Sequence, residues 1–259
     1  MTLHITHNGP IATVTLDRPD VHNAFDAAMI AEVRTAFDAL SGDRHVRVVV
    51  LTGAGESFCA GGDMRWMQNV AGLTFEENLA DAAALAAMFE AIWTCPKVVL
   101  GRINGAAIGG GAGLAACCDL AIAADTARFG FGEVKIGLVP AVIAQYVVPK
   151  IGVSQARALF VSGERFSAER AFEIGLIHGV VPREELDATV MEIAQRCLTG
   201  APDAITTIKR VVDVVWESER LAAQRFVVEM LARVRTGNEA HEGIAAFKAR
   251  RRPPWASQQ

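Results

Sequence analysis

The sequence predicts an α/β fold: a core of parallel strands and helices, followed by a helical region at the C-terminal end. Continuous apolar runs at 46–52, 97–103 and 120–124 are typical of strands buried on both faces. Segments with helical periodicity separate these runs, which favours parallel pairing. After about residue 154, nearly every pattern is helical. With 259 residues, the chain is long enough for one large core and a smaller appendage.

The expected elements begin with a hairpin. β-branched residues alternate at 3–6 and 11–16, and the Asn8-Gly9 pair between them is a typical hairpin turn. A helix with Asp26 as its N-cap is expected over 26–40, and an alanine-rich helix over 76–94 is stopped by Pro96. A glycine-rich segment and a short helix precede the strand at 120–124. Later helices are expected at 155–161, 168–174, 184–199, 202–235 and 239–249.

Composition and charge exclude several classes of function. The formal net charge of −4 argues against general nucleic-acid binding. The five cysteines are odd in number and lack zinc-ligand spacing, which favours a reducing compartment and predicts no metal site. Because Arg102, Asn104 and Asp119 interrupt the apolar region 98–124, no membrane span is expected. The first ten residues lack a secretory pattern, so we expect a cytoplasmic protein, although a processed organellar enzyme would share these features.

Three glycine-containing segments, at 57–64, 107–113 and 129–140, contain the candidate chemistry. The first two follow predicted strands, and ligands bind at loops that follow the carboxyl ends of parallel strands. Gly110 and its two neighbours leave the backbone bare at the start of a helix, where free N–H groups favour negative charge on an oxygen. Position 113 is also a glycine, so this helix start lacks a side chain there.

Together with 18–25 and 175–181, these segments resemble the crotonase family of enoyl-CoA hydratases and isomerases over nearly the whole chain. Within that family, the residues at 58–67, 109–114 and 133–146 are most similar to the methylglutaconyl-CoA hydratase-like branch. The resemblance implies an acyl-CoA thioester as the ligand. It implies no metal or redox cofactor, because the thioester itself is the electron sink.

The resemblance also implies an architecture. A crotonase-like spiral of ββα units, holding the acyl-CoA site, is expected over 1–200. A C-terminal helical trimerisation region is expected over 201–259. The protein is therefore expected to form a homotrimer or a dimer of trimers, without a nucleic-acid or membrane partner.

Site residues follow from the same resemblance. The backbone N–H groups of Ala60 and Gly110 are expected to hold the thioester oxygen, and Glu133 matches one of the family's two catalytic glutamates. Gly113 falls where the other glutamate would stand. Residues expected to contact substrate or CoA lie in the glycine loops, before the first helix and on the last helix: His22, Ala24, Ala60, Gly61, Gly62, Asp63, Met64, Gly109, Phe247 and Lys248. For Asp63, capping the helix that begins near position 64 is the simpler role.

The chemistry of a thioester agrees with this assignment. Adding water to an α,β-unsaturated thioester, or moving a proton beside it, builds an enolate whose charge rests on the thioester oxygen, where two N–H donors stabilise it. Glu133 is the candidate to move the proton. The neighbouring Phe129, Phe131, Val134 and Ile136 are expected to desolvate its carboxylate and raise its pKa.

The glycine at 113 leaves two reactions open. One carboxylate suffices to isomerise a 3-enoyl-CoA to a 2-enoyl-CoA, whereas hydration requires Glu133 both to orient water and to deliver its proton. The similarity to the branch above favours hydration. Tyr146 is a candidate to place the water, Trp66 to line the acyl pocket, and Arg65 either to meet a distal carboxylate or to lie at the surface. The alternative of another class is a non-catalytic acyl-CoA-binding or RNA-binding relative, against which Glu133 and the acidic net charge argue.

Overall fold

The computed structural model describes residues 2–256, and within them it contains a six-stranded sheet and a three-stranded sheet. The larger sheet has the order β1 (Leu3–Asn8), β2 (Ile11–Leu16), β3 (Val48–Gly53), β4 (Val98–Ile103), β6 (Leu120–Ala124) and β9 (Gly179–Val181). The β1–β2 pair is the expected antiparallel hairpin, and every other pair in this sheet is parallel. The predicted α/β fold with parallel pairing is therefore confirmed.

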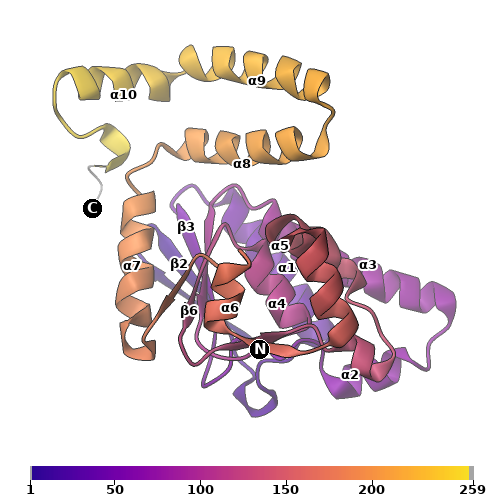
Figure 1. The fold of residues 1–259 in the computed structure, drawn as a ribbon. Coiled ribbons are helices and arrows are strands. Elements are labelled where there is room, and N and C mark those ends of the chain that lie inside the picture. The colour runs from indigo at the N-terminus through magenta and orange to yellow at the C-terminus, as the bar shows by residue number, and fades with distance from the viewer. Residues whose placement is uncertain (1, 257–259) are drawn as a thin grey trace.

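Some helices pack around this sheet, and others lie apart from it (Figure 1). The helices are α1 (Ala27–Gly42), α2 (Met64–Val70), α3 (Phe75–Trp93), α4 (Gly110–Cys117), α5 (Ala141–Ser162), α6 (Ala168–Glu173), α7 (Leu186–Cys197), α8 (Pro202–Glu217), α9 (Arg220–Arg235) and α10 (Asn238–Lys248), with short 3-10 segments η1 (Pro19–Val21), η2 (Glu133–Ile136), η3 (Arg183–Glu185) and η4 (Pro254–Ala256).

Side chains of one strand alternate between two cores. Along β3, Val49 and Leu51 belong to the large core that contains side chains of α1, α3 and α4, whereas Val48 and Val50 pack in a smaller core with side chains of α7. All four side chains are buried. This alternation explains why the strand has an unbroken apolar sequence.

The smaller sheet brings the glycine-containing segments together. It consists of β5 (Ala107–Ile108), β7 (Arg128–Gly130) and β8 (Arg165–Ser167). Isolated bridges add two loop contacts, Cys59 to Ala107 and Phe25 to Gly62. The segment before α1, the loop after β3, the start of α4 and the chain before η2 therefore meet in one place.

Two expected helices differ from the structure. The helix expected at 155–161 is only the end of α5, which starts at Ala141 and bends at Gly152, where φ is 75° and ψ is 159°. The single helix expected over 202–235 is two helices, because Ser218 and Glu219 adopt extended backbone between α8 and α9. The break lets α9 pack against α8.

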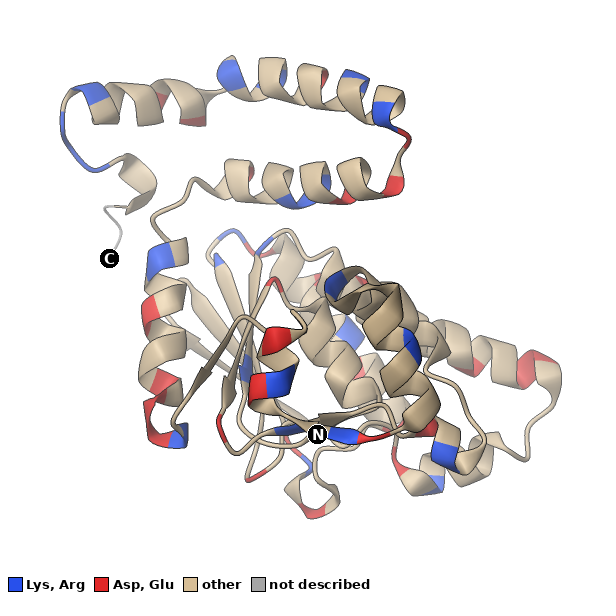
Figure 2. Ribbon diagram, in the orientation of Figure 1, with Lys and Arg blue, Asp and Glu red and all other residues tan. Residues whose placement is uncertain are grey.

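The helices α8, α9 and α10 form a layer apart from the strands and the other helices (Figure 1). In the view of Figure 2, basic and acidic residues are interspersed both over α8–α10 and over the rest of the chain. No helix within the described residues is long and apolar enough to cross a membrane.

Candidate active site

A cleft of about 650 Å³ opens where the glycine loops meet. Many of the predicted site residues line it: Ala24, Ala60, Gly61, Gly62, Asp63, Met64, Gly109, Gly110 and Glu133. These residues come from four separate segments of the chain. The fold therefore brings most of the predicted site together.

Glu133 lies at the first position of η2 and contacts the start of α4. Its Oε2 atom is buried and has no hydrogen-bond partner among the described residues. A Cβ atom at Gly109 would lie 2.9 Å from Glu133 Oε1, and Gly109 has a φ of +53°, so position 109 needs glycine for both space and backbone conformation. The Glu133 carboxylate therefore lies close to the start of α4.

Burial raises the pKa of the Glu133 carboxyl, as the sequence predicts. Part of the predicted cause is wrong. Val134 and Ile136 are 42% and 54% exposed, so they do not enclose the carboxylate, whereas Phe129 and Phe131 are buried. The preceding aromatic residues anchor the chain, and the 3-10 turn exposes the apolar side chains that follow.

The predicted pair of N–H donors needs one correction. The Ala60 N–H donates to the His22 carbonyl oxygen at 2.9 Å, so it is not free to hold a substrate oxygen. Two residues later, the Gly62 N–H has no acceptor within residues 2–256, and neither does that of Gly110. Gly62 and Gly110 both line the cleft. The free donors of the two loops are therefore at Gly62 and Gly110.

Hydrogen bonds from the segment before α1 hold the Gly62 loop. The Phe25 N–H donates to the Gly61 carbonyl at 2.8 Å, and the Asp63 N–H donates to the Phe25 carbonyl at 2.9 Å. The buried Asn23 side chain donates to the carbonyl oxygens of Ala54 and Ser57, each at 2.8 Å. These bonds from the chain itself fix the loop in place.

Asp63 performs the structural role that the sequence favoured. Its carboxylate caps α2 by accepting a hydrogen bond from the Arg65 N–H at 2.8 Å. It also forms an ion pair with Arg18 at 2.9 Å. Burial alone would raise the pKa of Asp63, but these partners lower it. The side chain of His22 is exposed and contacts Ser57, at 3.0 Å, and His22 does not line the cleft.

Gly113 faces an apolar wall rather than open space. A Cβ atom there would lie 2.3 Å from Ile143 Cγ2 and 3.1 Å from Phe89 Cε1. Ile143 is on α5, in a stretch for which no helix was expected. The position that matches the second glutamate is therefore filled from a distant part of the chain.

A second cavity, of about 360 Å³, adjoins the cleft and shares Gly62, Gly110 and Glu133 with it. Trp66 lines this cavity, as expected for an acyl pocket. Tyr146 does not: its hydroxyl donates to Glu90 at 3.1 Å, and its ring packs against Trp93. Because the buried ring points into the core, the expectation that Tyr146 places water is wrong.

Phe247 and Lys248 lie at the end of α10, away from this cleft (Figure 1). Phe247 is 85% exposed. Because the C-terminal helices extend away from the strands, this chain's last helix does not reach its own cleft.

The sequence singled out only one of the cationic side chains at the cleft, Arg65. Arg18, Arg65, Lys135 and Arg165 line it. Arg18 is paired with Asp26 and Asp63, whereas the other three form no ion pair within residues 2–256. Only the fold brings α2, η2 and β8 to one edge, so no local pattern in the sequence identifies this group.

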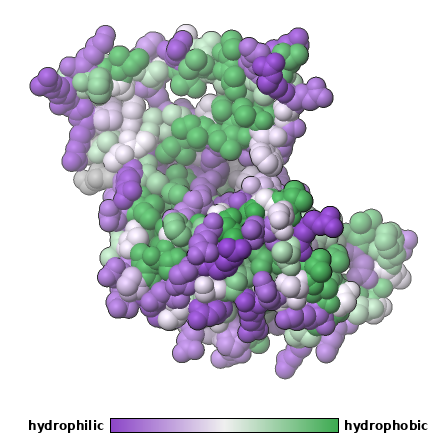
Figure 3. Space-filling model, in the orientation of Figure 1, coloured by the Kyte–Doolittle hydropathy of each residue, from purple (hydrophilic) through white to green (hydrophobic). Residues whose placement is uncertain are grey.

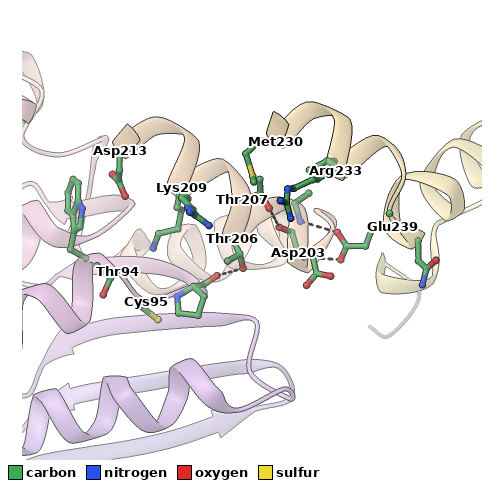
Figure 4. A pocket seen from close by; sticks show the side chains of 17 residues that line it. Thr94, Cys95, Asp203, Thr206, Thr207, Lys209, Asp213, Met230, Arg233 and Glu239 are labelled. Atoms are coloured by element: carbon green, nitrogen blue, oxygen red, sulfur yellow. Dashed lines mark hydrogen bonds between the residues drawn. The ribbon is translucent and has the colours of Figure 1, made fainter. Parts of the chain in front are cut away.

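A further cavity of about 650 Å³ lies between the end of α3 and the C-terminal helices (Figure 4). The Thr206 hydroxyl there donates to the Pro96 carbonyl, and Glu239 accepts from the N–H groups of Asp203 and Ala204. These bonds join structural elements, and none of the predicted catalytic residues lies in this cavity.

Comparison with known proteins identifies the family of this chain. The family model described as enoyl-CoA hydratase/isomerase matches residues 6–258. A solved structure of an enoyl-CoA hydratase from Shewanella pealeana has a TM-score of 0.94 and 36% identity, over 98% of this chain and 96% of that one. Pseudomonas aeruginosa AtuE has a TM-score of 0.95 and 34% identity, over 99% and 100% of the two chains. Carnitinyl-CoA dehydratase of Escherichia coli is 34% identical over 263 residues, 98% of each chain. The chain therefore belongs to the enoyl-CoA hydratase/isomerase family and has the crotonase fold.

Proposed function

We propose that this enzyme catalyses the syn hydration of a 2-enoyl-CoA thioester. One observation carries the proposal: Glu133 lines both cavities together with Gly62 and Gly110, whose N–H groups have no acceptor within residues 2–256. The relatives named above include a hydratase and a dehydratase, which supports a reaction that adds or removes water.

The proposed reaction uses one carboxylate for both proton transfers. Glu133 removes a proton from water as the hydroxyl adds to the β-carbon of the acyl group. The electron pair moves through the α-carbon to the thioester oxygen, where the Gly62 and Gly110 N–H groups stabilise the negative charge. Glu133 then returns the proton to the α-carbon as the carbonyl re-forms. Because one group serves both carbons, hydrogen and hydroxyl add to the same face. The thioester accepts the charge, so the proposal includes no cofactor.

The cleft is suited to the CoA part of the substrate. Arg65, Lys135 and Arg165 lie on its wall without an ion-pair partner in the described chain. Phosphate groups are favourable partners for such cations. This charge distribution supports binding of a phosphate-bearing carrier in the cleft.

Isomerisation of a 3-enoyl-CoA is the second candidate. The observation that favours it is the apolar wall at Gly113, where Ile143 leaves no room for a second carboxylate. Isomerisation needs only that Glu133 take a proton from one carbon and return it to another.

The absorbance of the conjugated thioester separates the candidates. Purified protein is mixed in turn with 2-enoyl-, 3-enoyl- and 3-methylglutaconyl-CoA esters. Hydration removes the conjugated absorbance of a 2-enoyl ester, and isomerisation creates it from a 3-enoyl ester. A non-catalytic binder of acyl-CoA or RNA leaves all absorbances unchanged, and that result would overturn the proposal.

We also propose assembly as a homotrimer or a dimer of trimers. Apolar side chains of Ile208, Val212 and Trp216 recur on one face of α8 and are more than half exposed in the single chain. Figure 3 shows hydrophobic surface gathered over α8 and α9. In such an assembly, Phe247 and Lys248 would meet CoA in the cleft of a neighbouring copy. Sedimentation velocity tests this, and a monomer would contradict it.

A further inference from the structure

The cavity beside the cleft identifies the kind of acyl group that fits. It shares Gly62, Gly110 and Glu133 with the cleft, so a thioester held at the donors extends its acyl chain directly into this space. The remaining wall comes from α2, α3, α5 and the segments beside them, and it includes Trp66, Ala71, Asn78, Phe89, Val139 and Ile143.

The polar groups of this wall are few, and all but one have partners. Glu133 is the single ionisable side chain that lines the cavity. The Asn78 amide donates to the carbonyl oxygens of Leu73 and Thr74, which holds the start of α3. The Trp66 N–H donates to Asp81 at 3.2 Å. No cationic side chain therefore lines this cavity within the described residues.

We infer that the substrate carries an apolar, medium-length acyl chain and not a dicarboxylic one; this inference rests on the proposed function. A distal carboxylate would lose water without gaining a cation, and the one ionisable side chain that lines the cavity, Glu133, carries the same charge. Arg65, the candidate partner for such a carboxylate, lines the cleft instead. A methylglutaconyl ester therefore fits poorly.

The size and the rim of the cavity favour a chain longer than that of a butenoyl ester. A volume of about 360 Å³ greatly exceeds the share of a single small group, about 30 Å³ for a water molecule. Leu138 and Val139 line the cavity and are 49% and 72% exposed in the free protein. Figure 3 shows hydrophobic surface near the start of α3, where Phe75 and Leu79 are exposed. Each methylene group that covers such surface raises kcat/KM by about fourfold.

The test is kcat/KM for three esters: 2-butenoyl-, 2-octenoyl- and 3-methylglutaconyl-CoA. The octenoyl chain has four more methylene groups than the butenoyl chain, so its full burial would raise kcat/KM by about 250-fold, and we expect a gain of at least about tenfold. We expect the octenoyl ester to exceed the methylglutaconyl ester by about a hundredfold. Preference for the butenoyl or the methylglutaconyl ester would overturn the inference. If no ester is turned over, the proposed function fails, and the dissociation constants of octanoyl-CoA and glutaryl-CoA then decide the inference: tighter octanoyl binding supports it, and equal or tighter glutaryl binding overturns it.

A matched pair of variants locates the acyl chain. Ala71 lines the cavity at the end of α2, so Ala71→Trp should narrow it and reduce kcat/KM for the octenoyl ester by about tenfold, with the butenoyl ester within about twofold. Ala82→Trp adds the same side chain at an exposed position of α3 outside the cavity and should change neither value. Equal losses on both esters in Ala71→Trp, with an unchanged melting temperature, would contradict this placement.

Discussion

The two cavities that meet at Glu133 differ in the charge of their walls. Arg65, Lys135 and Arg165 line the larger cleft, whereas the smaller cavity has hydrocarbon walls and no ionisable side chain other than Glu133. A ligand with a charged carrier at one end and a hydrocarbon chain at the other therefore fits in one direction only. In the proposed reaction, both walls orient the ester, so that its reacting carbons lie beside Glu133, where the two cavities meet.

Removing the charge of Glu133, which lies where the two cavities meet, should have the largest effect on activity. Glu133→Gln should lower kcat by about 10²–10⁴-fold, because the side chain can no longer take a proton. The same variant should be more stable at neutral pH: the raised pKa means that the native state holds the charge at a cost, and stability falls as pH rises through that pKa. Steady-state kinetics and urea unfolding measure the two effects, with Glu164→Gln, an exposed carboxylate outside both cavities, as the control. Full activity in Glu133→Gln would refute the mechanism.

Removing the Gly110 N–H donor should have the next largest effect on activity. Proline is tolerated at the first position of a helix but has no N–H, so Gly110→Pro deletes the donor at the start of α4. Gly110→Ala keeps the N–H and places a Cβ against Phe25 in the same way, 2.4 Å from its Cζ. We expect kcat of the proline variant to be about 10²–10³-fold below that of the alanine variant. Equal rates would show that this N–H does not hold the oxyanion.

Adding a carboxylate at Gly113 should destabilise the protein rather than improve catalysis. In Gly113→Glu the new side chain meets Ile143 and Phe89, and its charge is buried without a partner. We expect the free energy of unfolding to fall by about 2–4 kcal/mol, measured by urea denaturation. Adding Ile143→Ala should restore part of the loss. A stable, faster single variant would contradict the tight contact at this wall.

The pH dependence of kcat/KM tests the raised pKa of Glu133 without a mutation. Glu133 must be ionised to accept a proton, and burial raises its pKa above the ordinary value of 4.5. Activity should therefore fall by up to about tenfold per pH unit as pH drops through that raised pKa. An acid limb centred at or below 4.5 would show that the carboxylate is not desolvated in the free enzyme.

Removing a cationic side chain from the larger cleft should have the smallest effect. Lys135 is exposed, so Lys135→Ala should raise KM by about two- to fivefold and leave kcat unchanged. The effect should shrink at high salt, because exposed charges are screened. Arg44→Ala, which removes an exposed charge outside both cavities, should leave KM unchanged. A matching rise in KM in both variants would remove Lys135 from the binding surface.

The strands and most of the site were predictable because their signals are local. A strand buried on both faces leaves an unbroken apolar run, and β6 spans the expected residues 120–124. The glycine segments likewise mark close approaches of the backbone. The break between α8 and α9 was not predictable, since Ser218 and Glu219 include neither glycine nor proline, and packing between the two helices determines it.

The finer parts of the site depend on contacts between distant residues. Ala60 and Gly62 are two positions apart in one loop, and the bond from Ala60 to the His22 carbonyl decides which N–H is free. In the same way, only α5 shows that Ile143 faces Gly113. Sequence identified the loop and the missing side chain, but not the free donor or the residue that fills the gap.

The hydrogen bonds that Phe25 and Asn23 make to the Gly62 loop have a consequence for the time course of binding. Since the chain's own hydrogen bonds hold this loop, we expect substrate capture to need no slow closing step at the donors. Association should then be a single phase in rapid mixing, with a rate that rises linearly with ester concentration and no plateau. The speed of capture would be set by the encounter of ester and cleft rather than by the protein's own rearrangement.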